Sequence, residues 1–78
     1  MNPIKLKQME RRCAELEDEI AGLEEAIARC ETALQEFVSS EQTMRQTAEL
    51  GESRARMEEL FREWEETTQA VEASREAV

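Results

Sequence analysis

The sequence predicts an all-α protein, a two-helix antiparallel coiled-coil hairpin that forms one domain over residues 1–78. Charged residues make up 37% of the chain, which holds only two glycines and one proline, a composition typical of long helices and coiled coils. Apolar residues recur at alternating steps of three and four through the first half, the spacing of a coiled-coil seam. Two adjacent serines interrupt this pattern near the middle of the chain, where a second helix can begin.

The first helix is expected over residues 4–37. Asn2 can cap its N-terminus, and Pro3 suits the first turn, where no intrahelical N–H is needed. The seam positions follow each other without a slip, so they share one face of the helix. They are Leu6, Met9, Cys13, Leu16, Ile20, Leu23, Ile27, Cys30, Leu34 and Phe37.

Residues 38–40 are expected to form a short tip, compatible with a 3₁₀ turn. Ser39 and Gln42 have the spacing of a capping box, and Glu41 places a negative charge in the first turn of the next helix. We therefore expect the second helix over residues 41–76.

The second helix carries a weaker seam, in which several positions are polar. Polar seam residues lower the stability of a coiled coil but can determine its register. The expected positions are Leu50, Met57, Trp64, Val71 and Val78, alternating with Thr47, Arg54, Phe61, Thr68 and Arg75. The expected layers pair Ile27 with Met57, Leu23 with Phe61, Ile20 with Trp64, and Cys13 with Val71. The seam core is therefore assigned to Leu16, Ile20, Leu23, Ile27, Met57, Phe61 and Trp64.

The two flanks of this expected seam differ in character. One flank gathers carboxylates, which are either solvated or covered by a basic partner: Glu10, Glu17, Glu24, Glu31, Glu58, Glu65 and Glu72. Because these positions would face each other across the arms, we expect them to repel. The other flank is small or apolar and could pack on a neighbouring domain: Ala26, Ala33, Ser53, Leu60 and Thr67.

Catalytic and metal chemistry find no support in the residues. The chain has no histidine, and Cys13 and Cys30 would lie about 25 Å apart on one helix, beyond disulfide reach. At seam positions both thiols act as small apolar side chains, so we expect no enzyme, metal or cofactor here. Unbridged cysteines and the lack of an apolar run of about 18 residues favour a cytoplasmic protein without a membrane span.

The distribution of charge limits nucleic-acid binding. Nucleic-acid affinity comes mainly from cationic groups on phosphate, and the net charge of −9 opposes strong binding by the isolated chain. The candidate contacts are Lys5, Lys7, Arg11 and Arg12 near the start, and Arg45, Arg54 and Arg56 nearer the tip.

Three segments resemble a known family. They are Asn2–Leu6 (NPIKL), Glu15–Glu24 (ELEDEIAGLE) and Phe61–Glu66 (FREWEE), which look like the C-terminal coiled-coil domain of ABC-F ATPases of the Uup type. The resemblance implies an α-hairpin with a 3₁₀ turn near its bend, and contact with DNA or the ribosome. It also implies that the chain is a fragment of a larger protein whose ATP sites lie in upstream ATPase domains. No segment here resembles a phosphate-binding loop, so no ATPase residue carries over.

Two functions follow from these observations. The leading hypothesis is a non-catalytic coiled-coil domain that contacts nucleic acid, DNA in particular, or the ribosome. The alternative is a purely structural coiled coil for dimerisation or domain spacing. A hairpin that closes on itself predicts a 9.0 kDa monomer, whereas a zipper of two chains predicts twice that mass.

Overall fold

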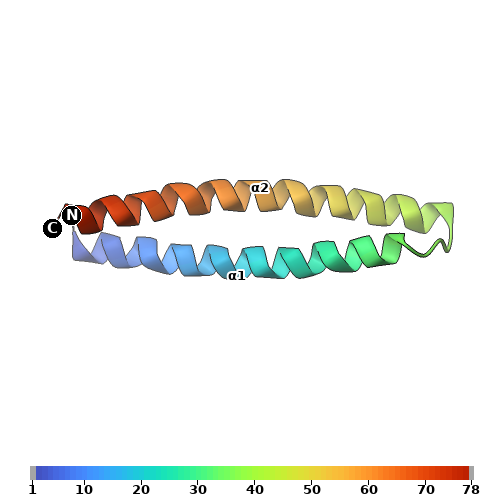
Figure 1. The fold of residues 1–78 in the computed structure, drawn as a ribbon, viewed down its shortest axis with the longest axis horizontal. Helices are drawn as coiled ribbons and strands as arrows, with labels where there is room; N and C mark the ends of the chain where they lie inside the picture. Colours follow the sequence, from blue (N-terminus) through green and yellow to red (C-terminus); the bar gives the residue numbers. More distant parts are fainter. Residues whose placement is uncertain (1, 78) are drawn as a thin grey trace.

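Two long helices lie side by side and antiparallel in the computed structural model, which describes residues 2–77 (Figure 1). Helix α1 spans Pro3–Leu34 and helix α2 spans Ser40–Glu76. They form a rod of 58 × 15 × 14 Å, with both ends of the chain at one end and the connection 35–39 at the other. The expected all-α hairpin is confirmed.

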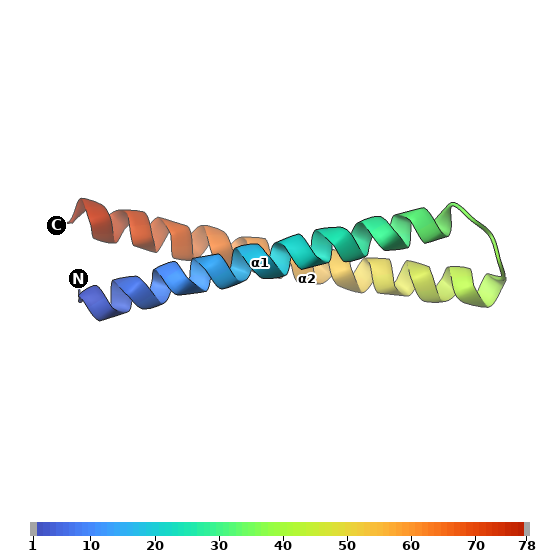
Figure 2. The same cartoon turned by 90° about the horizontal axis from the view of Figure 1, so that it is seen from below.

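The arms wrap around each other. They lie side by side in Figure 1 and cross near their middle in the view turned by 90° (Figure 2). Steps of three and four residues average about 3.5 residues per turn, slightly fewer than the ~3.6 residues per turn of a straight helix. The arms must therefore wrap around each other for the seam to keep facing its partner along a long contact.

Helix α1 has the expected cap, begins one residue before the expected start and ends before the expected boundary. The Asn2 side chain accepts a 2.9 Å hydrogen bond from the Ile4 N–H, which confirms the cap. The helix ends at Leu34, three residues before the expected boundary. Its last turn tightens, since the N–H groups of residues 35 and 36 bond to carbonyls three residues back, at 3.1 and 3.3 Å. These are 3₁₀-type bonds, but the connection 35–39 holds no 3₁₀ helix among the described residues.

The cap of α2 is also confirmed. The Ser39 hydroxyl accepts a 3.1 Å hydrogen bond from the Gln42 N–H, and α2 begins at Ser40. Glu41 lies in the first turn and Arg75 in the last, so both charges complement the helix dipole.

The core lies in the seam between the arms. Leu16 and Leu60 have 0% and 1% of their surface exposed, and with Ile20 they form a buried cluster. Three partly buried side chains pack around this cluster, as the seam assignment expected: Leu23, Met57 and Trp64. Further buried apolar residues along the rod are Cys30, Leu50 and Val71.

The expected seam position of Phe61 is wrong. Phe61 is 42% exposed, and the adjacent Leu60 occupies the core instead. Each of the two stands three or four residues from both Met57 and Trp64, so the spacing rule admits either one. The expected layer of Leu23 with Phe61 is thereby replaced by packing of Leu23 against the cluster that contains Leu60.

Several other seam assignments change with the ends of the helices. Phe37 is 74% exposed because α1 has already ended before it, and Ile27 is only half-buried. Val78, assigned to the seam, lies outside the described residues.

Candidate interaction surfaces

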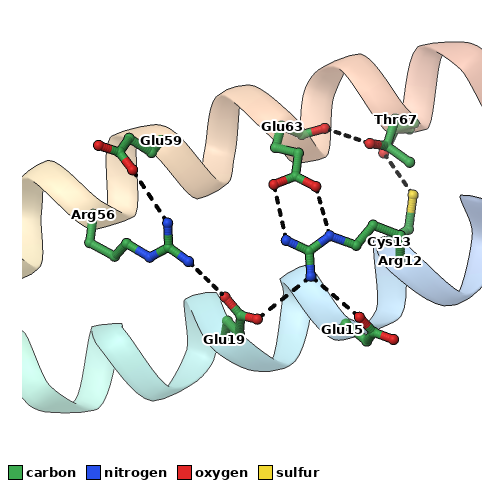
Figure 3. Close-up of polar contacts among 9 residues, drawn as sticks. Arg12, Cys13, Glu15, Glu19, Arg56, Glu59, Glu63 and Thr67 are labelled. Carbon is green, nitrogen blue, oxygen red and sulfur yellow. Dashed lines mark hydrogen bonds and ion pairs between the residues drawn. The ribbon is translucent and has the colours of Figure 1, made fainter.

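An ion pair joins the two arms near the core. The guanidinium of Arg12 donates from Nε to Glu63 Oε2 at 2.6 Å and from Nη2 to Glu63 Oε1 at 3.0 Å (Figure 3). Two parallel bonds of this kind hold a carboxylate in one orientation as well as attracting it. The pair therefore holds one register between α1 and α2.

This pair belongs to a larger polar network along one flank (Figure 3). Arg12 also approaches Glu15 at 3.3 Å and Glu19 at 3.7 Å on its own helix. Glu19 in turn receives Arg56 from α2 at 3.5 Å. Arg56 completes the network with Glu59 at 3.3 Å.

The network shifts the titration of its central pair. The hydrogen bond to Glu63 is the main cause that raises the pKa of Arg12 above its ordinary value. The same bond lowers the pKa of Glu63 below its ordinary value. Both groups are therefore charged at neutral pH.

Of the expected nucleic-acid contacts, Arg12 and Arg56 already form ion pairs with carboxylates of this chain.

The other candidate cations fall into two groups. Arg54 faces Glu31 across the arms at 3.7 Å. The remaining ones are exposed and have no carboxylate partner among residues 2–77: Lys5, Lys7, Arg11 and Arg45. Three of these lie in the first turns of α1, at the open end, while Arg45 lies near the tip (Figure 1). The structure therefore does not bring the seven candidates into one basic patch.

The prediction that the glutamates of one flank face and repel each other across the arms is also wrong. Glu10 pairs with Arg75 and Glu31 with Arg54, each across the arms, and the indole Nε1–H of Trp64 donates to Glu17 at 3.2 Å. Because α2 packs with Leu60 inward, its arginines rather than its glutamates face the glutamates of α1.

The opposite flank, expected to be free for a neighbouring domain, is largely consumed by the hairpin itself. Leu60 is in the core, and the rest of this set is half-buried: Ala26, Ala33, Ser53 and Thr67. The seam of α2 uses Leu60 in place of the adjacent Phe61, which turns this flank toward α1 and explains the outcome.

The two thiols occupy different environments. Cys13 is half-buried, with its Sγ 3.7 Å from Thr68 Oγ1. Cys30 is buried, and burial is the main cause that raises the pKa of its thiol, assisted by the nearby charge of Glu49. A raised pKa keeps the Cys30 thiol protonated and poorly nucleophilic.

The region of the tip exposes three large apolar side chains that the seam pattern did not reveal. Phe37 and Val38, within the connection, are 74% and 65% exposed, and Met44, in the second turn of α2, is 71% exposed. Phe37 and Val38 follow the last helical turn of α1, so only an accurate helix boundary could have identified them as exposed.

The described residues hold neither a metal site nor a membrane span. No group of three or more potential ligands could hold a metal ion among residues 2–77. Neither α1 nor α2 offers a stretch long and apolar enough to cross a membrane.

Comparison with protein-family models, with curated proteins and with solved structures found no match to this chain. The fold and its surfaces define a class of protein, a two-helix coiled-coil hairpin with a charged network on one flank and exposed apolar residues near its tip.

Proposed function

We propose that this chain is a non-catalytic coiled-coil hairpin that acts as a spacer. The observation that carries this proposal is the shape, a rod of 58 × 15 × 14 Å with both ends of the chain at one end. Buried seam residues at several levels of the rod and ion pairs between the arms support stiffness along its length. Such a rod holds its exposed tip residues at a set distance from its open end.

Distance measurement between spin labels tests the spacer. Labels at Lys5→Cys and Val38→Cys, in a chain carrying Cys13→Ala and Cys30→Ala, should give one narrow distance distribution. Removing one heptad from each arm should shorten the distance by about 10 Å, because a helix rises ~1.5 Å per residue. A broad distribution, or no shortening, would refute the spacer. Sedimentation distinguishes a closed 9.0 kDa monomer from a dimer, the other structural reading.

A second candidate function is contact with nucleic acid or the ribosome, as the resemblance to ABC-F C-terminal domains implies. The observation in its favour is that Lys5, Lys7 and Arg11 are exposed at the open end with no carboxylate partner among the described residues. In this reading ATP is bound by upstream domains, and the two free cysteines support a cytoplasmic location.

A salt titration of binding to duplex DNA, single strands and ribosomes tests this second candidate. Affinity should fall as salt rises, and should be lost in Lys5→Ala/Lys7→Ala/Arg11→Ala. Arg45→Ala is the control, because Arg45 is an equally unpaired cation at the other end of the rod. Equal loss in both variants would indicate only a general effect of charge.

A further inference from the structure

The α2 helix carries two overlapping seams. Four residues at seven-residue spacing belong to both: Leu50, Met57, Trp64 and Val71. Alternating with these, one seam uses Gln46, Ser53, Leu60, Thr67 and Ser74, and the other uses Thr47, Arg54, Phe61, Thr68 and Arg75. Each alternative set contains one large apolar residue, Leu60 or Phe61.

The structure adopts the first seam and leaves the second beside it. Leu60 is 1% exposed, whereas Phe61 remains 42% exposed and lines the surface next to Ile20 and Trp64. Neighbouring residues on an α-helix are separated by ~100°. A rotation of α2 by about half that angle would exchange Leu60 for Phe61 and keep the shared residues in contact with α1.

We propose that α2 has two packing positions on α1, the one described and a second in which Phe61 replaces Leu60 in the seam. Truncating Leu60 therefore transfers α2 to the second position instead of leaving a cavity. The charges on the flanks set the balance between the two positions.

Apolar packing favours neither position strongly. Phe61 offers at least as much apolar surface as Leu60, and burial of such surface is the main driving force of packing. Thr67 and Thr68 are equivalent in kind at the next level of the seam.

The charges favour the described position. In it Arg54 and Arg75 lie outside the core and pair with Glu31 and Glu10. Rotation would turn both arginines into the seam, which costs desolvation. It would also turn three glutamates of α2 toward those of α1, which repel: Glu58, Glu65 and Glu72.

A double-mutant cycle tests the transfer. Alone, Phe61→Ala should change the unfolding equilibrium constant by less than about threefold, as exposed substitutions do. In the Leu60→Ala background it should raise that constant by at least about tenfold, because Phe61 then fills the core. Leu50→Ala is the control background, since Leu50 belongs to both seams and Phe61 cannot replace it. Additive effects in the Leu60→Ala background would overturn the proposal.

Fluorine NMR reports the rotation directly. The chain has two phenylalanines, so fluorophenylalanine labelling gives two signals, which Phe37→Leu assigns. In Leu60→Ala, the Phe61 signal should lose its shift between H₂O and D₂O as the ring becomes buried, and the Phe37 signal should keep it. A Phe61 signal that stays solvent-sensitive in the folded variant would contradict the second position.

A charge variant decides the matter if Leu60→Ala does not fold. Glu58→Lys/Glu65→Lys removes the repulsion that opposes the second position, so the Phe61 signal should become less solvent-sensitive. Glu52→Lys/Glu76→Lys changes the net charge equally at exposed sites away from both seams and should leave that signal unchanged. Failure of Leu60→Ala to fold, with no greater protection of Phe61 in the charge variant than in its control, overturns the proposal.

Discussion

The Arg12 guanidinium reaches from α1 to α2 and donates to both carboxylate oxygens of Glu63, at 2.6 and 3.0 Å. This is a contact between positions 51 residues apart in the sequence, so it forms only when the arms are in register. Its two parallel hydrogen bonds distinguish it from surface pairs held by a single contact, which contribute little.

We expect Arg12→Ala to lower the urea midpoint of unfolding, because Glu63 then loses its cross-arm partner. Arg11→Ala is a matched control, since the neighbouring Arg11 is exposed and pairs with no carboxylate among the described residues. Equal midpoints for the two variants would show that the pair adds no stability.

The same pair predicts a pH dependence. The hydrogen bond from Arg12 lowers the pKa of Glu63 below its ordinary value of 4.5. The pair therefore adds stability above the pKa of the unfolded chain, and this stability is lost as the pH falls through the lower, folded pKa. We expect wild type and Arg12→Ala to differ in urea midpoint at neutral pH and to converge in acid below this range. A difference that persists or grows in acid would contradict the assignment.

Burial separates two isoleucines of the α1 seam. Ile20→Ala should cost about 2–4 kcal/mol of unfolding free energy, as truncation of a buried aliphatic side chain does, because Ile20 lies in the central cluster. Ile27→Ala should cost less, since Ile27 is only half-buried. Urea unfolding measures both, and a larger loss at Ile27 would contradict the observed packing.

The cap of α2 gives another matched pair. Ser39→Ala should lower the unfolding free energy by about 1 kcal/mol, the usual cost of a lost N-cap, because the Ser39 hydroxyl accepts the Gln42 N–H. Ser40→Ala should have little effect, since Ser40 is the exposed first residue of the helix. Similar losses in both variants would rule out the cap as the cause.

Cysteine cross-linking checks the register. In a Cys30→Ala background, Thr68→Cys should form a disulfide with Cys13, since Cys13 Sγ lies 3.7 Å from Thr68 Oγ1. The bond should add about 2–4 kcal/mol, the typical gain from closing such a loop. The exposed position of Gln69 supplies the control, Gln69→Cys, which should remain reduced. A disulfide in the control alone would mean that α2 faces α1 differently.

Local signals in the sequence predicted the hairpin and both caps correctly. Asn2 and Ser39 each carry an oxygen one step before a helical pattern, and both accept the expected N–H. The choice between Leu60 and Phe61 could not be made in this way, because both satisfy the spacing to Met57 and Trp64. It depends on cross-arm charges, and these appear only once the two arms are placed together.

The choice of Phe61 instead of Leu60 also made the predictions for the two flanks of the seam wrong. In the described packing, Arg54 and Arg75 of α2 take the places opposite α1 where glutamates were expected. The expected repulsion is therefore absent, and the candidate cation Arg54 is paired with Glu31. The helix end at Leu34 was missed because periodicity continues to Phe37 without regard to the backbone.

The adjacent ends of the chain determine how the rod would respond to mechanical load. A pull on Pro3 and Glu76 in opposite directions would act across the seam at the open end, where the arms would separate layer by layer. The pair of Glu10 and Arg75 would break among the first contacts, and those near the tip would break last. The hairpin would thus open as a zipper at low force, whereas a push along its axis would load both arms together.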